Sequence, residues 1–198
     1  MYHTVIIGGG CLGAATAVSL QRKLNSIGKG EKVCLIEKAV LCAAESSRHS
    51  GIVRSANADP DASMMANLST KMWKDLSGIW GLKMELDEFG AIWIAKKNED
   101  GENPAWSELA KRMKKIDLTF EEISPKSAIS KCGTTLITDE NESYFFEPEA
   151  FQLDPSILRS TLYNAIDANG VDLYEKTEVD SIIFKGNEIV GCTTNNGK

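Results

Sequence analysis

The stretch Val5-Ile-Ile-Gly-Gly-Gly-Cys-Leu-Gly13 decides the fold of this 198-residue chain. Before it, His3 to Ile7 form a short run of β-branched residues that is typical of a buried strand. After it, Ala14 to Leu24 carry apolar residues at helical spacing, and a second apolar strand from Lys32 to Ile36 ends at Glu37. The pattern predicts a strand, a glycine-rich turn, a helix and a second strand parallel to the first.

Each glycine of this turn has a mechanical reason. Gly8 permits the tight turn out of the strand, Gly10 lets the backbone approach a pyrophosphate, and Gly13 lets the helix lie close to the sheet. The helix N-terminus offers unpaired N–H groups and a partial positive charge to an anion. Glu37 lies where a carboxylate accepts hydrogen bonds from ribose hydroxyls, and its charge repels a 2′-phosphate. In this context the motif predicts a dinucleotide site for FAD or NAD rather than NADP.

The remainder of the chain does not continue as regular strand–helix units. A polar loop over 43–55 precedes an amphipathic helix from Asp61 to about Trp80, in which Met65, Leu68, Met72, Leu76 and Ile79 recur every three or four positions. Because an NAD-binding domain usually extends its parallel sheet at this point, the change favours a fold with a substrate domain inserted early. Further predicted elements are a strand over 89–95, a helix over 104–115, a helix from Pro155 to about Ala168 with Asp154 and Gly170 as its caps, and strands over 171–174, 178–184 and 188–193.

Composition excludes several classes of function. The net charge of −6 comes without a basic stripe, so we expect no nucleic acid partner. Five dispersed cysteines and only two histidines provide no zinc-ligand spacing, so we expect no metal site and a reducing compartment such as the cytoplasm. No apolar run is long enough for a transmembrane segment, and the first residues lack the pattern of a signal peptide.

The last residues, Asn195-Asn-Gly-Lys198, carry the signal of a tight hairpin turn after a strand. Such a turn requires a returning strand. We therefore expect the chain to be the N-terminal portion of a longer protein, completed by a C-terminal segment or by a second chain.

Several stretches together resemble one family. The resemblance begins in Val5–Gly13, Ala17, Leu20 and Val33–Lys38, and it continues in Ser46–Arg54, Phe89–Ile94, Phe151–Pro155 and Gly170–Val179. These stretches are similar to the D-amino-acid oxidase-like (DAO) flavoproteins, which include sarcosine and glycine oxidases, amino-acid dehydrogenases and 2-hydroxyglutarate dehydrogenase. The resemblance implies an α/β fold: a Rossmann-like FAD-binding domain of the GR2 type with an inserted α+β substrate domain, truncated before its C-terminal half. It divides the chain into residues 1–80 (FAD domain, first part), 81–150 (substrate domain) and 151–198 (return to the FAD domain).

The resemblance also implies roles for particular residues. Arg54 would lie at the edge of the substrate pocket, and no catalytic residue can be assigned, because the missing half supplies most of that pocket. The implied FAD contacts are Gly8, Gly10, Cys11, Leu12 and Gly13 at the pyrophosphate, Glu37 and Lys38 at the ribose, Ser46, Ser47, Arg48, His49, Ser50 and Gly51 along the stretch from pyrophosphate to flavin, and Val179 at the adenine.

The resulting hypothesis is an FAD-dependent oxidoreductase that oxidises a small amino acid, a secondary amine or a 2-hydroxy acid by hydride transfer to flavin. Two alternatives remain open at this point. One is an NAD-dependent dehydrogenase. The other is a non-catalytic nucleotide-binding fragment or subunit that needs a partner chain.

Overall fold

The computed structural model describes residues 1–75, 80, 86–132 and 136–197. Within these residues the chain forms two compact units. The first holds Met1–Ser50 together with Asp154–Lys198, and the second holds Gly51–Asp75 together with Glu85–Leu153. Each unit is described below by itself.

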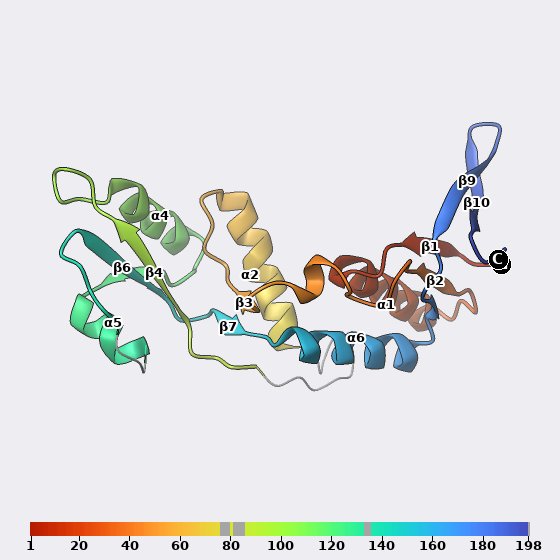
Figure 1. Ribbon diagram of the computed structural model, residues 1–198, viewed down its shortest axis with the longest axis horizontal. Helices are drawn as coiled ribbons and strands as arrows, with labels where there is room; N and C mark the ends of the chain where they lie inside the picture. The colour runs from red at the N-terminus through yellow and green to blue at the C-terminus, as the bar shows by residue number, and fades with distance from the viewer. Residues whose placement is uncertain (76–79, 81–85, 133–135, 198) are drawn as a thin grey trace. The chain divides into compact units, whose positions relative to one another are not determined.

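The first unit contains a three-stranded parallel sheet, of which β1 and β2 are labelled in Figure 1. Strand β2 (Val33–Ile36) lies between β1 (Thr4–Ile7) and β8 (Asp172–Tyr174), with Thr4 opposite Val33 and Cys34 opposite Asp172. All four residues of β2 are buried, as a continuous apolar run in the middle of a parallel sheet requires. Both strands predicted around the glycine turn are present, but β1 is not buried as predicted, because Val5 and Ile7 are 38% and 54% exposed.

Two helices of the first unit, α1 (Cys11–Ser26) and α6 (Pro155–Asn169), pack against each other. As predicted, α6 is capped at both ends: the Asp154 carboxylate accepts a hydrogen bond from the Ser156 amide at 2.7 Å, and Gly170 takes the left-handed conformation with φ of 76°. The buried apolar residues of the two helices are Ala14, Ala17, Val18 and Leu24 in α1 and Leu158, Leu162, Ala165 and Ile166 in α6.

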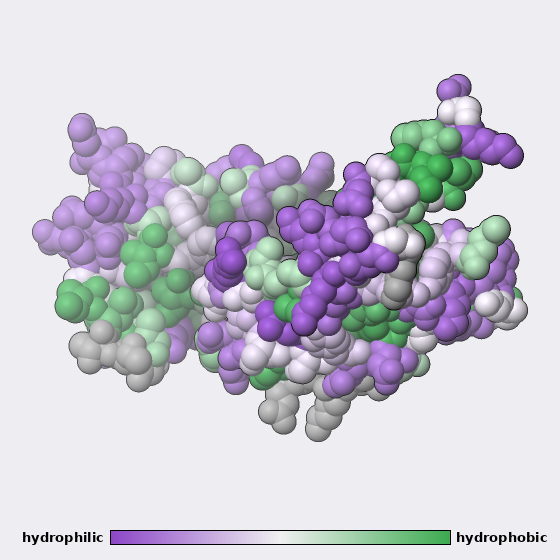
Figure 2. Space-filling model, turned by 45° about the vertical axis from the view of Figure 1, so that its right-hand side comes forward, coloured by the Kyte–Doolittle hydropathy of each residue, from purple (hydrophilic) through white to green (hydrophobic). Residues whose placement is uncertain are grey.

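A hairpin of β9 (Val179–Lys185) and β10 (Glu188–Thr194) follows β8. It exposes several large apolar residues, and Figure 2 shows hydrophobic colour over much of it. The predicted turn after β10 is present, because the Gly197 amide donates to the Thr194 carbonyl at 3.0 Å. The exposed apolar residues of the hairpin are Ile182, Ile183, Phe184, Ile189 and Val190.

The second unit is built on an antiparallel sheet in the order β4 (Ala91–Lys96), β6 (Glu142–Glu147) and β5 (Glu121–Ile123). Strands β3 (Ile52–Val53) and β7 (Phe151–Gln152) form a separate two-stranded antiparallel sheet. Helix α4 (Pro104–Lys115) places Met113 in a core with Phe120 and Phe145, against which Trp93 and Trp106 also pack. Helices α2 (Pro60–Lys74) and α5 (Pro125–Cys132) complete the unit.

Two predictions in the second unit differ in detail from the structure. The strand predicted over 89–95 runs from Ala91 to Lys96, because Gly90 has φ of 77° and cannot extend the ladder toward Phe89. In the predicted amphipathic helix, Met65, Leu68 and Met72 lie on α2 but are exposed. Leu76 and Ile79 lie outside the described residues.

Candidate functional site

The glycine turn connects β1 to α1 with the backbone geometry that the motif requires. Gly8 has φ of 106°, a conformation that residues with a side chain rarely adopt. Its amide donates to the Ile36 carbonyl at 2.8 Å, so the turn stays attached to the end of β2. Gly10 precedes the helix, and its carbonyl accepts the amide of Ala14 at 2.9 Å.

The space around the turn leaves no room for a Cβ at Gly13 or Gly9 and little room at Gly10. A Cβ at Gly13 would overlap the carbonyl oxygen of Gly8, so Gly13 allows the first turn of α1 to lie against the strand end. A Cβ at Gly10 would lie 3.3 Å from the hydroxyl of Ser46. Gly9, a position at which the motif allows any residue, is also constrained, because its Cβ would lie 2.9 Å from the Cβ of Glu37. In the sequence, the signal for this constraint on Gly9 is its place in a run of three glycines.

The N-terminus of α1 is an open anion site. The Cys11 amide donates to the hydroxyl of Ser46 at 3.0 Å, and the first turn of α1 contains no acidic residue. In the part of the chain that the structure describes, the amides of Leu12 and Gly13 have no hydrogen-bond acceptor. Two unsatisfied donors at the positive end of a helix favour a bound anion such as a phosphate.

Glu37 is held beside this turn. One of its carboxylate oxygens accepts the Gly9 amide at 2.7 Å, and the other accepts the Ala39 amide at 2.8 Å. The side chain remains partly exposed, and each carboxylate oxygen has a second lone pair for a hydroxyl donor. Lys38, the next predicted contact, is exposed.

The chain returns to Glu37 after β8, through residues that the sequence did not single out. The Thr177 amide donates to the Glu37 carbonyl at 3.0 Å, and the Lys176 amide donates to the Ala39 carbonyl at 2.7 Å. Lys176 has φ of 50°, which marks a tight backbone turn at this point. The predicted adenine contact, Val179, is the first residue of β9 and is half-buried.

The polar loop after β2 is brought to the glycine turn through one residue. Ser46, in the short 3-10 helix η1 (Glu45–Ser47), makes the bond to Cys11. Ser47 donates to the Ala44 carbonyl at 3.1 Å, and the His49 ring lies 3.0 Å from the Ser46 carbonyl, so both contacts stay within the loop. The other residues predicted here, Arg48 and Ser50, are exposed.

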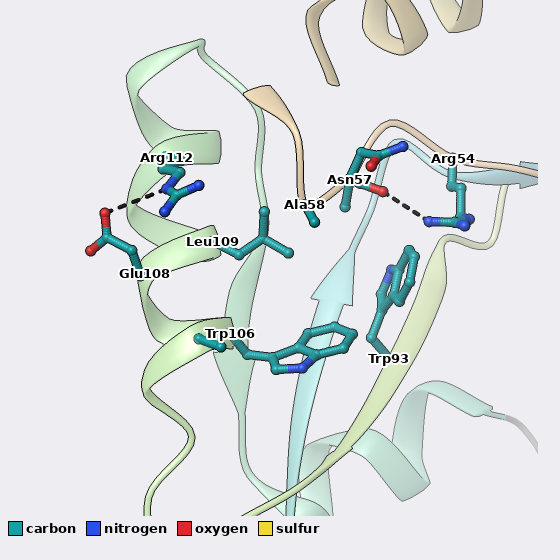
Figure 3. Close-up of a pocket in the computed structure, with 10 residues that line it drawn as sticks. Arg54, Asn57, Ala58, Trp93, Trp106, Glu108, Leu109 and Arg112 are labelled. Atoms are coloured by element: carbon teal, nitrogen blue, oxygen red, sulfur yellow. Dashed lines mark hydrogen bonds and ion pairs between the residues drawn. The ribbon is translucent and has the colours of Figure 1, made fainter. Parts of the chain in front are cut away.

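Two predicted contacts belong to the second unit. Gly51 has φ of 79°, its carbonyl accepts the Leu153 amide at 2.9 Å, and a Cβ there would overlap the carbonyl of Leu153. Arg54 donates to the Ala56 carbonyl at 2.9 Å, with its guanidinium 4.4 Å from the ring centre of Trp93 (Figure 3).

Cys42 lies next to the turn, because its amide donates to the Gly9 carbonyl at 2.8 Å. Burial raises the pKa of its thiol to about 11, with the nearby Cys11 adding to the shift. The thiol is therefore neutral near pH 7 and leaves the positive field of the helix N-terminus unopposed.

All five cysteines are free. Among the described residues, no group of three or more His, Cys, Asp or Glu side chains is placed to hold a metal ion.

The residues fit the adenosine diphosphate part of FAD. The bare backbone at Gly10 and Gly13 gives a pyrophosphate room to approach, the two amides without acceptors can donate to it, and the Glu37 carboxylate can accept hydrogen bonds from ribose hydroxyls. The amide of Cys11, the first residue of α1, donates to the Ser46 hydroxyl instead.

No helix among the described residues has the length and apolar character needed to cross a membrane.

Comparison with known proteins agrees with this geometry. L-proline dehydrogenase from P. horikoshii superposes with a TM-score of 0.82 at 22% identity, covering 99% of this chain and 50% of that one. Glycine oxidase from Bacillus cereus superposes with a TM-score of 0.78 at 23% identity, covering 100% and 52%. At these identities the likeness establishes a shared fold, over about half the length of each solved structure.

A curated relative and a family model extend the comparison. The mitochondrial regulatory subunit of pyruvate dehydrogenase phosphatase from Mus musculus is 24% identical over 196 residues, which are 99% of this chain and 21% of that protein. The chain thus spans about a fifth of the relative's length. The model of the DAO family, described as FAD dependent oxidoreductase, matches residues 3–198. Together with the nucleotide-type site at α1, this match shows that the chain belongs to the DAO family of FAD-dependent oxidoreductases.

Proposed function

We propose that this chain supplies the nucleotide-binding portion of an FAD-dependent enzyme that oxidises a small amino acid, a secondary amine or a 2-hydroxy acid. The observation that carries the proposal is the α1 N-terminus, where two amides without acceptors in the described part of the chain adjoin a turn with no room for a Cβ at Gly13. Bound flavin would supply the hydride acceptor. The chain's own residues would hold the cofactor by its pyrophosphate and ribose.

The proposed contacts follow the geometry of the first unit. The amides of Leu12 and Gly13 would donate to the pyrophosphate, and the hydroxyl of Ser46 would release the Cys11 amide to do the same. Glu37 would accept ribose hydroxyls on its free lone pairs while Gly9 and Ala39 hold it in place. The division into residues 1–80, 81–150 and 151–198 rests on the family resemblance alone. The same holds for the remaining proposed contacts, which are Lys38, Ser47, Arg48, His49, Ser50, Gly51, Val179 at the adenine and Arg54 at the substrate.

The substrate class rests on the family and on its solved members. The names of the two solved structures refer to proline and to glycine, both amino acids. Because the chain spans about half of each of those structures, we assign the reaction to the intact protein, in which further polypeptide on the same chain or on a partner completes the flavin site. Five free cysteines support a reducing compartment such as the cytoplasm.

A second candidate is a regulatory, non-catalytic subunit that keeps the nucleotide fold. The mouse relative favours it, because that protein is named as a regulatory subunit. The NAD-dependent alternative has less support. An NAD-binding domain usually extends its parallel sheet with the next strand–helix unit along the chain. Here the strand that pairs with the free edge of β2 is β8, which follows the second unit in the sequence.

The test uses the intact gene product that contains this sequence. The purified protein is examined for visible flavin absorption, incubated with FAD or NAD, and then mixed anaerobically with glycine, proline, sarcosine or 2-hydroxyglutarate. We expect bound FAD, no uptake of NAD, and loss of the oxidised flavin spectrum with at least one amine or hydroxy acid. Bound FAD that no such compound reduces would support the regulatory candidate. A protein that neither contains nor takes up FAD would refute both.

A further inference from the structure

The residues from Glu37 to Cys42, called segment 37–42 below, hold the middle of the glycine turn at two points. The Glu37 carboxylate accepts the Gly9 amide at 2.7 Å, and the Gly9 carbonyl accepts the Cys42 amide at 2.8 Å. Both backbone polar groups of Gly9 are therefore bonded to the two ends of this segment. Because Gly9 lies between Gly8 and Gly10, the shape of the turn depends on where segment 37–42 lies.

Segment 37–42 is held in turn by helix α6 and by a residue that follows β8. The Glu175 carboxylate, directly after β8, accepts the Leu41 amide at 2.6 Å and also the hydroxyl of Tyr163 on α6. Arg159, also on α6, donates from its guanidinium to the Cys42 carbonyl at 3.2 Å. Arg159 and Tyr163 are four residues apart, so they lie on the same face of the helix. Three side chains from outside the glycine turn thus fix the end of segment 37–42.

The backbone of Cys42 requires these contacts. Cys42 has φ of 56°, a left-handed conformation that residues with a Cβ keep only where their surroundings impose it. Its amide is bonded to Gly9 and its carbonyl to Arg159, so both of its backbone polar groups are constrained. Loss of the Arg159 bond would leave one of these constraints, and segment 37–42 could then relax away from Gly9.

Arg159 carries an unfavourable feature that packing alone does not explain. Its Nε–H is buried and has no acceptor among the described residues. A buried donor without an acceptor destabilises a fold at least as much as an ordinary hydrogen bond stabilises it. The stability of α6 therefore does not account for an arginine at this position, whereas the placing of segment 37–42 does.

Tyr163 and Glu175 form the second point of support. Burial raises the pKa of the Tyr163 phenol, and the hydrogen bond to Glu175 raises it further. The phenol therefore remains a donor near neutral pH. It bonds the same carboxylate oxygen that accepts the Leu41 amide, and so fixes the position of that oxygen.

We propose that Arg159, Tyr163 and Glu175 are positioning residues of the nucleotide site. They hold segment 37–42 so that its first residue stays at the ribose and its last residue keeps the turn open to the pyrophosphate. They act through this segment and do not touch the cofactor. The inference rests on the proposed function, which it deepens by naming residues outside the glycine motif that set the affinity for FAD.

Titration of the intact protein with FAD, followed by flavin fluorescence, measures the effect on binding. Arg159→Met keeps much of the side-chain length and removes every donor. We expect it to weaken FAD binding about tenfold, as the loss of a charged hydrogen bond implies. Arg159→Lys should recover most of the affinity, because the bond to Cys42 needs only one donor. Asn164→Ala, at an exposed position of the same helix, is the control and should leave FAD binding unchanged.

A double-mutant cycle tests whether the second support acts through the segment. Tyr163→Phe removes only the hydroxyl that fixes Glu175, and Glu37→Gln removes the ribose carboxylate at the other end of segment 37–42. Independent residues lose affinity additively, whereas coupled residues do not. We expect the double variant to lose clearly less FAD affinity than the two single losses combined.

Hydrogen exchange without nucleotide separates positioning from a general loss of structure. In Arg159→Met, residues 9–13 and 39–42 should exchange severalfold faster, whereas α6 should exchange as in the unchanged protein. If Arg159→Met does not fold, Tyr163→Phe replaces it in this measurement and in the FAD titration.

Three results would overturn the inference. They are full FAD affinity in a folded Arg159→Met protein, additive losses in the cycle, and equal acceleration of exchange in α6 and in residues 9–13. An unchanged protein that takes up no FAD would refute the proposed function, and the exchange of residues 9–13 would still decide whether Arg159 holds the turn. A protein that binds FAD equally well in every variant would refute this inference alone.

Discussion

Gly13 is the single residue on which the proposed nucleotide site depends most directly. A Cβ there would overlap the Gly8 carbonyl, so Gly13→Ala must push α1 away from the end of β1. We expect a loss of about 1–3 kcal/mol in stability, as overpacking typically costs, together with loss of FAD uptake. Thermal unfolding and flavin titration measure the two effects. Gly30→Ala is the matched control, because no atom lies within 4 Å of its Cβ. Equal behaviour of the two variants would contradict the assignment.

The thiols of Cys34 and Cys42 should resist alkylation. Burial raises the pKa of each to about 11, so at pH 8 about one in a thousand is ionised, against about a quarter for an ordinary thiol. Mass spectrometry after iodoacetamide treatment should find Cys11, Cys132 and Cys192 modified first, because these are partly exposed. Because the pKa of each thiol is higher in the folded state than in the unfolded state, the two thiols stabilise the fold fully below about pH 8.5, and this contribution is lost as the pH rises toward 11. Early modification of Cys34 or Cys42 in folded protein would contradict the prediction.

Only part of the site could be predicted at the level of single residues. The motif placed Gly8, Gly10 and Gly13 in the turn, because local backbone geometry requires glycine there, and it placed Glu37 beside the turn, because the parallel pairing of β1 and β2 aligns Ile7 with Ile36. The bond from Cys11 to Ser46 depends on how a loop 35 residues away folds back, and no local pattern encodes that. The buried carboxylate of Glu147, at the end of β6, could not be predicted for the same reason. Its partners Ser55 and Trp93 lie 92 and 54 residues away, and in the sequence it reads as an ordinary acidic residue.

At the level of elements, α6 should owe most of its stability to packing against α1. Leu162 is fully buried in α6, so Leu162→Ala should cost about 2–5 kcal/mol through lost burial and a residual cavity. Ile157 on the same helix is 37% exposed, and Ile157→Ala should cost clearly less. Urea denaturation followed by circular dichroism compares the two. If both variants lose the same stability, α6 does not pack as described.

Prediction of the elements succeeded where a local signal was complete. Helix α4 begins and ends as predicted, and α6 follows from Asp154, Pro155 and Gly170. The short elements β3, β5, α5, β6 and β7 were not predicted. Strands β3 and β7 have only two residues each, so no period can be read from them, and their pairing joins positions about 100 residues apart. Helix α2 carries an apolar stripe that the structure leaves exposed, which shows that periodicity predicts a helix better than it predicts which face is buried.

At the scale of the whole molecule, the open amides of α1 and the Glu37 carboxylate all belong to one of the two compact units. FAD should slow amide exchange in residues 8–14 and 37–47, where these groups lie. Helix α4 belongs to the other unit, supplies none of these groups and serves as the internal reference. Ligand binding stabilises the segments that it orders, so the protection should grow with FAD saturation. Hydrogen exchange of the intact protein, read by mass spectrometry with and without FAD, measures it. Protection of α4 without protection of 8–14 would mean that FAD does not recognise the residues assigned to it.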